Sequence, residues 1–172
     1  MISEVKGQRN WQDYGLKDLR EINQDLHLPF PKELKKAESI EDAIALVAEV
    51  FRLLPDDDFV AIDCCIGQLI VQRNNIEHIV EKRNDARERY APHALATIKN
   101  PFEVWEVMYE KEERRYAFIG LFAQKRQMLV IVSIQKDNVL WNFMHTDKKR
   151  LNKHRHGQLI YPTAEKQKAA NE

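Results

Sequence analysis

One segment of the chain places an imidazole among charges at a spacing that could serve catalysis. In HIVEKRNDARERY (78–90), polar residues recur at intervals of four, three and four positions: His78, Lys82, Asp85 and Arg89. In a helix these positions form one stripe. A histidine there could donate or accept a proton near neutral pH, because its ordinary pKa is about 6.5. The alternative is a solvated face of ion pairs, on which Arg87 and Glu88 are also surface charges.

A second group of candidates lies in the polar segment 147–157, between two predicted strands. Against a single acidic residue it carries five cations: Lys148, Lys149, Arg150, Lys153 and Arg155. Guanidinium and ammonium groups suit phosphate binding. We expect Lys149, Arg150 and Arg155 to contact phosphates, together with Lys82; the alternative is a flexible loop without a specific ligand. His154 and His156 flank Arg155 without cysteine or acidic neighbours, so no metal site is predicted.

The predicted strands supply further polar side chains at their ends. Arg115 lies at the start of the strand 114–123, and Thr146 ends the strand 138–146, where its hydroxyl could bind a phosphate oxygen. Trp141 is expected to share one side of the strand 138–146 with Phe143 and His145. We expect Trp141 in the core, with a base-stacking platform as the alternative.

The charge of the chain is unevenly distributed, although the net charge is zero. Residues 1–113 hold 15 Lys and Arg against 23 Asp and Glu, whereas residues 114–157 hold 10 against 2. A basic block of this size predicts a polyanionic partner, most simply nucleic acid. The alternative is that the basic block packs on the acidic one, and the two interpretations are compatible.

Several established motifs are absent from the sequence. It contains no Walker A motif, no GxGxxG, no HExxH and no GxSxG. The acidic run 56–58 is interpreted as a solvated turn. Cys64 and Cys65, which are adjacent to each other, are interpreted as reduced residues of a strand. We therefore predict neither a cofactor nor a metal.

The periodicity predicts helices first and an antiparallel sheet afterwards, which is an α+β domain. Helices are expected over 39–54, over 76–90, and from Asn100, where Asn-Pro-Phe-Glu resembles an N-cap followed by Pro at the first helical position. A β-hairpin is expected around 59–72. The sheet itself is expected to have four strands: 114–123, 127–135, 138–146 and 158–163.

The domain organisation follows from this pattern. We expect an N-terminal arm (1–38) with a short helical turn, an α+β domain (39–163) and a frayed tail (164–172). No run approaches the roughly 18 apolar residues of a membrane helix. The first residues show no signal-peptide pattern, so no membrane partner and a cytoplasmic location are predicted.

Parts of the chain resemble a known family. The stretches are IEHIVEKRNDARERYAPHALATIKNPFEVWE, RRYAFIGLF, MLVIVSI, VLWNFMHT and RHGQLIYP. They are similar to the phage-associated nuclease domains of the barnase–EndoU–colicin–RelE-like group, the second such phage family, over roughly 40–163. These domains are often appended to head-morphogenesis proteins of the Mu F-like type, so the resemblance also implies a virion-associated location as an option.

The resemblance implies helices on a four-stranded antiparallel sheet and metal-independent RNA cleavage that leaves a 2′,3′-cyclic phosphate. His78 matches the helix histidine of the family and is the expected proton-transfer group. Arg115 is the expected phosphate clamp, and Thr146, where the family places a polar residue after the third strand, is expected to join His78 and Arg115 as a catalytic residue. Arg155 lies in the R-x-G-x-L-I-Y segment and is expected to bind phosphate. The second proton carrier stays open among His145, His154, His156 and Lys82, as does the assignment of base and acid.

Two classes of function compete at this level. The first is a ribonuclease acting on RNA, with tRNA as one option and with an immunity protein or a phage structural protein as further partners. The second is a non-catalytic nucleic-acid-binding or phage structural module that uses the same basic surface without turnover. A weaker third option is that the basic segment binds only the acidic part of the chain or another protein.

Overall fold

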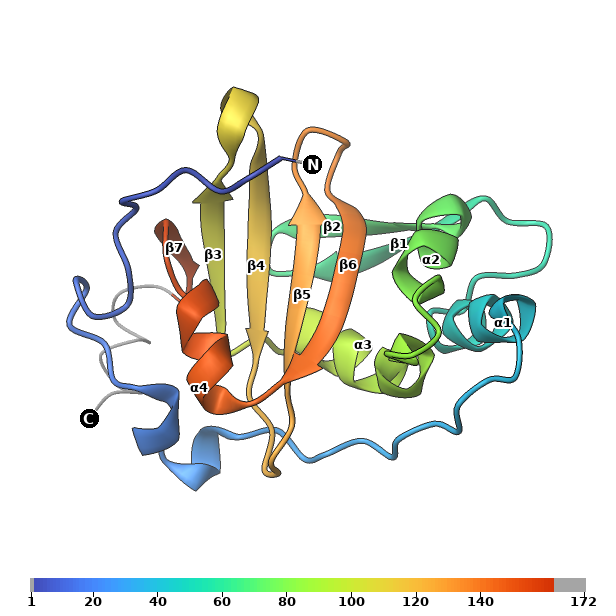
Figure 1. The fold of residues 1–172 in the computed structure, drawn as a ribbon, viewed down its shortest axis with the longest axis horizontal. Helices are drawn as coiled ribbons and strands as arrows, with labels where there is room; N and C mark the ends of the chain where they lie inside the picture. The colour runs from blue at the N-terminus through green and yellow to red at the C-terminus, as the bar shows by residue number, and fades with distance from the viewer. Residues whose placement is uncertain (1, 163–172) are drawn as a thin grey trace.

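A single mixed β-sheet organises the computed structural model, which describes residues 2–162. The seven strands lie in the order β1-β2-β6-β5-β4-β3-β7 (Figure 1). Only β2 and β6 are parallel, and all other neighbours are antiparallel. The strands are β1 Phe59–Cys64, β2 Gly67–Gln72, β3 Glu103–Met108, β4 Arg114–Gly120, β5 Gln127–Ser133, β6 Val139–Thr146 and β7 Gln158–Tyr161.

Four α-helices accompany the sheet within the described residues: α1 Ile40–Val50, α2 Arg73–Val80, α3 Ala91–Lys99 and α4 Lys148–Leu151. The predicted α+β class is confirmed. The first helix also begins where the capping pattern places it, because the Ser39 hydroxyl accepts a hydrogen bond of 3.1 Å from the amide of Asp42. In the part of the chain that the structure describes, no helix is long and apolar enough to cross a membrane.

The sheet is larger than predicted, so the expectation of four antiparallel strands needs correction. The three central predicted strands form the antiparallel meander β4–β5–β6. The fourth, β7, pairs with β3 at the far edge. The hairpin β1–β2 joins the other side of the sheet through one parallel pair, Ile70 with Val139. The predicted tail (164–172), with Thr163, lies outside the described residues.

The helix predicted from Asn100 is wrong, because this segment forms strand β3. Val104 and Trp105 are both completely buried, and successive residues of a strand point to opposite faces. The segment is therefore covered on both sides and lacks the polar alternation that marks a half-exposed strand. The capping signal was local, whereas pairing with β4 and β7 decides the conformation.

The helix predicted over 76–90 is interrupted. Helix α2 ends at Val80, Ala86 takes a left-handed conformation (φ 44°), and a 3₁₀ turn follows at Arg87–Tyr90. Lys82, Asp85 and Arg89 therefore do not continue a stripe from His78. The physical reason lies in Glu88, predicted as a surface charge, which is completely buried and bonded to Arg83 at 2.6 Å and to the amide of Ala37 at 3.0 Å.

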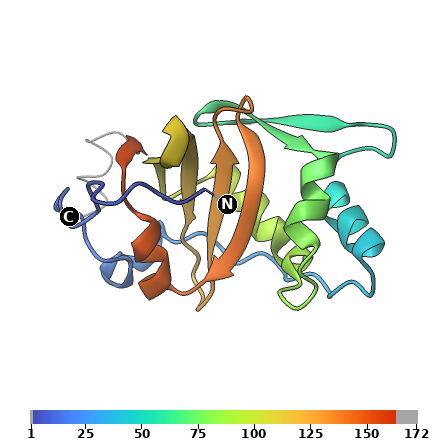
Figure 2. The same cartoon turned by 45° about the horizontal axis from the view of Figure 1, so that its top comes forward.

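The two faces of the sheet are covered differently. Helices α1, α2 and α3 pack on one face over a large apolar core, which includes Val104, Phe118, Val130 and Phe143. The other face carries a smaller core around Trp105, which the N-terminal arm and α4 cover (Figures 1 and 2). The second face is covered incompletely, and its uncovered part lies over the central strands.

The first part of the N-terminal arm follows the second face as an extended segment, and from Leu28 onward the arm packs against the large core. It contains two 3₁₀ turns, at Leu19–Glu21 and Gln24–Leu26. Its backbone bonds to β3, where the amide of Val5 donates to the Met108 carbonyl at 3.0 Å. Further along, the amide of Leu28 donates to the Leu121 carbonyl at 2.8 Å. These bonds attach the arm to the sheet at Val5 and to the residue after β4 at Leu28.

A buried ion pair connects the arm, the sheet and the segment after α4. Arg155 donates to both carboxylate oxygens of Glu103, at 2.6 and 2.7 Å, and neither side chain is exposed. The same guanidinium donates to the Lys17 carbonyl of the arm at 2.9 Å and to Oδ1 of Asn152 at 3.0 Å. Trp105 Nε1 completes the set by donating to Glu103 at 3.0 Å. Each charge is thus satisfied without water.

Replacing Arg155 with methionine is expected to lower the free energy of unfolding by about 3–5 kcal/mol, because Glu103 is left charged and buried without its partner. Urea unfolding measures the change, and Arg150→Met on the exposed surface of α4 is the matched control. The double variant Arg155→Met, Glu103→Leu should recover part of the loss. A loss below about 1 kcal/mol in the single variant would contradict the assigned role.

Candidate active site

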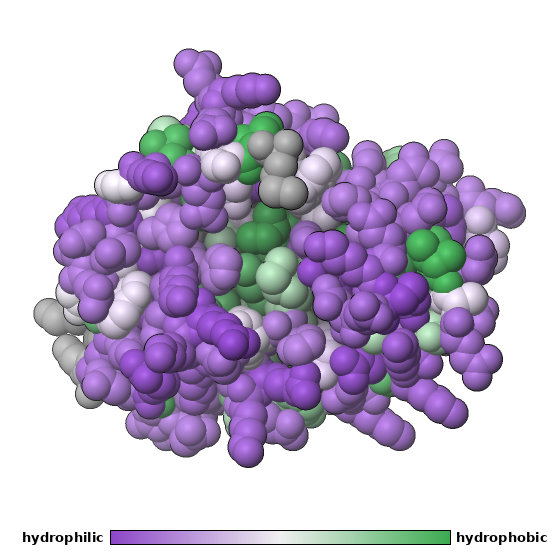
Figure 3. Space-filling model, in the orientation of Figure 1, coloured by the Kyte–Doolittle hydropathy of each residue, from purple (hydrophilic) through white to green (hydrophobic). Residues whose placement is uncertain are grey.

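A cavity of about 440 Å³ opens on the uncovered part of the second face. Its floor is formed by the central strands, one wall by α2 and the residues after it, and the opposite wall by the 3₁₀ turn Asn152–His154 that follows α4. Figure 3 shows an apolar surface recessed between polar walls near the middle of this face. The cavity therefore combines an apolar base with ionisable sides.

A β-bulge shapes the floor of the cavity. Ile131 pairs with Asn142, but the next pair along the ladder is Val132 with Leu140, so Trp141 is an extra residue in β6. As a result, Trp141 and its neighbour Asn142 both line the cavity, beside Leu129 and Met144. The expected grouping of Trp141 with Phe143 and His145 is therefore wrong. Trp141 is half-buried rather than part of the core.

His78 reaches the cavity because its helix is anchored by the opposite side. Ile76, Ile79 and Val80 are buried in the large core, which leaves His78 exposed on the cavity side of α2. Its Nδ1 lies 3.2 Å from a carboxylate oxygen of Glu81, and its ring centroid is 6.0 Å from that of Trp141. The contact with Glu81 orients the ring and leaves Nε2 for a ligand.

His154 lines the opposite wall and is half-buried. Burial lowers the pKa of His154, and the neighbouring His156 and Lys153 act in the same direction, whereas the Glu4 carboxylate opposes them. The imidazole is therefore held in its neutral form near pH 7, in which one ring nitrogen can accept a proton.

Arg115 lies between the two walls, on β4. Its guanidinium carbon is 4.4 Å from the ring centroid of Tyr109 and 5.4 Å from that of Trp141. Nη2 is bonded to Glu113 at 3.0 Å, while the buried Nε has no hydrogen-bond partner among residues 2–162. Burial raises the pKa of Tyr109 to about 12, so the phenol stays neutral. The two aromatic rings hold this cation at the cavity.

The structure brings together three of the residues predicted from the sequence: His78, Lys82 and Arg115 all line the cavity. Thr146 does not line the cavity; it is the last residue of β6 and pairs with Gln127 on β5. Lys149 and Arg150 also lie elsewhere, on the exposed side of α4. The prediction that Arg155 binds phosphate is corrected by its complete burial against Glu103.

Other residues of the cavity were not predicted as a set. Arg87, expected as a surface charge, is 15% exposed and donates to Oδ1 of Asn142 at 2.7 Å. His154 was one of four open choices for a second proton carrier. A second choice, His145, packs on the helix-covered face, 4.3 Å from Tyr90 between ring centroids. The charged segment 78–90 could have pointed to Arg87 as a residue of the site. No pattern in the sequence indicated the bulge that exposes Asn142.

The remaining candidate groups stay outside the cavity. Cys64 and Cys65 are free thiols at the turn of the β1–β2 hairpin, and burial raises the pKa of both, that of Cys65 to about 11. Such thiols are poor nucleophiles at neutral pH. Within residues 2–162, no three His, Cys, Asp or Glu side chains gather in a group that could hold a metal ion.

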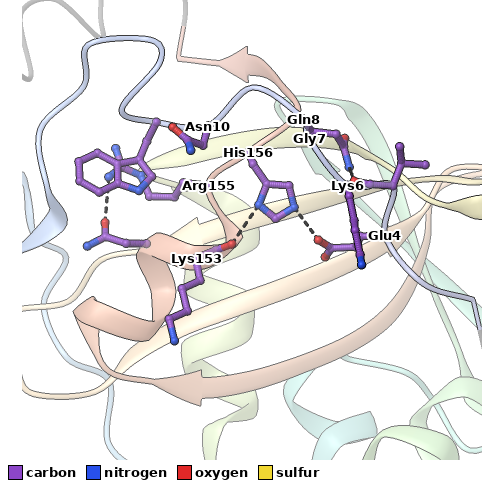
Figure 4. Close-up of a pocket in the computed structure, with 11 residues that line it drawn as sticks. Glu4, Lys6, Gly7, Gln8, Asn10, Lys153, Arg155 and His156 are labelled. Atoms are coloured by element: carbon purple, nitrogen blue, oxygen red, sulfur yellow. Dashed lines mark hydrogen bonds and ion pairs between the residues drawn. The ribbon is translucent and has the colours of Figure 1, made fainter.

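The arm is tied to the His154 wall by a second ion pair, His156 with Glu4. Nε2 of His156 lies 2.6 Å from Glu4, and its Nδ1 contacts the Lys153 carbonyl at 2.9 Å (Figure 4). Tyr109 donates to the other oxygen of Glu4 at 3.3 Å. Because Glu4 lines the cavity, the arm contributes directly to its wall.

An α+β domain with histidines and an arginine around one cavity of a sheet face has the groups that act on phosphodiesters. The comparison with family models agrees: residues 46–162 match phage-Barnase-EndoU-ColicinE5/D-RelE like nuclease2. The chain therefore belongs to this family of phage nucleases, which confirms the resemblance seen in the sequence. No curated protein and no solved structure matches the chain. The arm with Glu4 precedes the matched region.

The ion pair of Glu4 and His156 predicts a pH-dependent stability. The bond to Glu4 raises the pKa of His156 above 6.5, so its contribution is complete below pH 6.5 and is lost as the pH rises through the raised value. The bond to His156 lowers the pKa of Glu4 below 4.5, so that contribution is lost only as the pH falls through the lowered value. The free-energy difference between the wild type and Glu4→Gln should be largest between about pH 4.5 and 6.5.

Urea unfolding across this pH range measures the difference. His154 also faces this ion pair, and the Glu4 carboxylate acts to raise its pKa, so loss of Glu4 removes a further favourable interaction in the same acidic range. Glu77→Gln, on the exposed side of α2, is the control and should show no such dependence. A difference for Glu4→Gln that stays constant as the pH rises above 6.5 would contradict the role of the ion pair.

Proposed function

We propose that this protein is a metal-independent endoribonuclease that cleaves RNA by attack of the ribose 2′-oxygen and leaves a 2′,3′-cyclic phosphate. The observation that carries the proposal is the convergence of His78, His154 and Arg115 on one cavity from three separate elements. This set supplies two proton carriers and a cation between them. Membership of the nuclease family supports action on a phosphodiester.

His154 is assigned as the general base. Its lowered pKa keeps the imidazole neutral at pH 7, so it can take the proton of the 2′-hydroxyl. The freed 2′-oxygen then forms a bond to the adjacent phosphorus. The electron pair of the breaking bond between phosphorus and the 5′-oxygen remains on that oxygen.

His78 is assigned as the general acid. Glu81 orients the ring through Nδ1, and Nε2 delivers its proton to the departing 5′-oxygen. The products are a 2′,3′-cyclic phosphate and a free 5′-hydroxyl, so one proton has moved from the substrate to His154 and one from His78 to the product. Exchange with solvent restores both histidines.

Arg115 and Lys82 stabilise the charge that develops on the phosphate oxygens. Arg115 is held between two aromatic rings, so its position is set before the substrate arrives. A fixed cation of this kind stabilises the transition state without reorganisation during the reaction. Lys82 adds a mobile cation on the wall that carries His78.

Cleavage of an RNA oligonucleotide in the presence of EDTA tests the proposal. His78→Ala and His154→Ala should each lower the rate by about 100-fold or more, because general acid–base catalysis contributes at least this much. His145→Gln, on the opposite face of the sheet, is the matched imidazole control and should keep the wild-type rate. Activity that depends on an added divalent cation, or full activity of His78→Ala, would overturn the proposal.

The 2′-hydroxyl provides an independent test. An oligonucleotide with one cleavable ribonucleotide should be cut, whereas the same sequence with a 2′-O-methyl group at that position should resist, because the attacking oxygen is blocked. Mass spectrometry of the product should identify the cyclic phosphate. A 5′-phosphate product, or equal cleavage of the DNA sequence, would contradict attack by the 2′-oxygen.

A further inference from the structure

We propose that the floor of the cavity is a nucleobase pocket that selects guanine and uracil, which carry a carbonyl oxygen at C6 of the purine or C4 of the pyrimidine, over adenine and cytosine, which carry an amino group there. This inference rests on the proposed function and names the part of RNA that the cavity recognises. It is carried by Trp141 and Asn142, which the bulge in β6 turns toward the cavity together.

The floor has the apolar and aromatic character that a nucleobase requires. Leu129, Ile131 and Met144 line it beside the half-buried indole of Trp141. Unpaired bases of RNA stack on aromatic side chains, and this stacking tolerates any base. Trp141 thus supplies affinity for a base, and selectivity has to come from a polar group nearby.

The position of this floor relative to the cations suits a nucleotide. Two cations lie over the ring of Trp141: Nζ of Lys136 at 4.5 Å and the guanidinium of Arg115 at 5.4 Å from its centroid. A base that stacks on the indole takes the place of the Lys136 ammonium, which then lies beside the nucleotide and can pair with its phosphate. A purely apolar ligand would gain nothing from these cations.

The amide of Asn142 is fixed in one orientation. Its Oδ1 accepts a hydrogen bond from Arg87 Nη1 at 2.7 Å and one from the amide of Phe143 at 2.9 Å. Both partners are donors, so a flipped amide would place donor against donor. The Nδ2 group is left to donate to a ligand, since none of the described residues accepts a hydrogen bond from it.

Arg87 is itself held in place, because its Nη2 is bonded to Asp85 at 3.2 Å. The polar edge of the pocket consequently offers hydrogen-bond donors from Asn142 and Arg87. A carbonyl oxygen of guanine or uracil accepts from such an edge, whereas the amino group of adenine or cytosine would oppose it. Adenine or cytosine in the pocket would leave the donors of Asn142 and Arg87 without an acceptor. The energetic cost of these unpaired donors disfavours binding of the wrong base.

Binding of nucleoside 3′-monophosphates tests the pocket without relying on catalysis. Quenching of tryptophan fluorescence reports binding, and Trp141→Phe should remove that signal although Trp11 and Trp105 remain. Guanosine and uridine 3′-monophosphates should bind about tenfold more tightly than the adenosine and cytidine compounds, the discrimination typical of one well-placed hydrogen-bonding group. Equal affinities for all four would overturn the inference.

Asn142→Asp provides the decisive variant. A carboxylate keeps the bond from Arg87 but offers only acceptors, so the preference should shift by about tenfold toward adenosine and cytidine. Asn74→Asp, which adds the same charge on α2 outside the cavity, is the matched control and should keep the wild-type preference. If Asn142 only braces Arg87 against the sheet, Asn142→Asp will leave the ratio of affinities unchanged, and the inference fails.

The outcomes separate this inference from the proposed function. If the protein cleaves RNA in EDTA but binds all four nucleotides equally, the proposed ribonuclease function stands and the proposal of a selective pocket is rejected. Selective binding without cleavage would keep the pocket and reject the ribonuclease. The preference among cleavage sites in a mixed RNA sequence should follow the binding preference and shift in Asn142→Asp.

Discussion

The buried ion pair of Arg155 and Glu103 is the interaction on which the cavity depends. A guanidinium without exposure must have every charge compensated, and here the partners come from β3, from the arm and from the turn after α4. This requirement places His154, the residue before Arg155, at one wall of the cavity. Gly157 permits the return into β7, because its φ is 100° and a side chain there would meet the carbonyl of Glu106.

The cavity exists because regular structure is interrupted at two points. Helix α2 ends at Val80, so His78 and Lys82 form a wall while Arg87 returns toward the floor. The bulge in β6 turns Trp141 from the expected core to the other face. A continuous helix over 76–90 would have placed an uninterrupted charged stripe here. A regular strand β6 would have turned successive side chains to alternate faces, so Trp141 and Asn142 would not both face the cavity.

The separation of charge along the chain is used inside the fold, as one of the two interpretations of the sequence expected. Basic residues of 114–157 pair with acidic residues of the first part at four places: Arg114 with Glu106, Arg115 with Glu113, Arg155 with Glu103, and His156 with Glu4. These contacts dock one part of the chain on the other. Arg115 also lines the cavity. Internal docking thus uses part of the excess charge, and recognition of a polyanion stays a prediction.

The sequence by itself determined the α+β class, the capped first helix, the β1–β2 hairpin and the meander β4–β5–β6, because period-two runs and cap residues act locally. It also singled out His78 and Arg115 through their resemblance to the family. Tertiary structure alone decided that Glu103 belongs to a strand, that Glu88 and Arg155 are buried, and that Thr146, Lys149 and Arg150 lie away from the cavity. Each depends on a partner distant in the chain, and local propensity cannot register the energy of such a pairing.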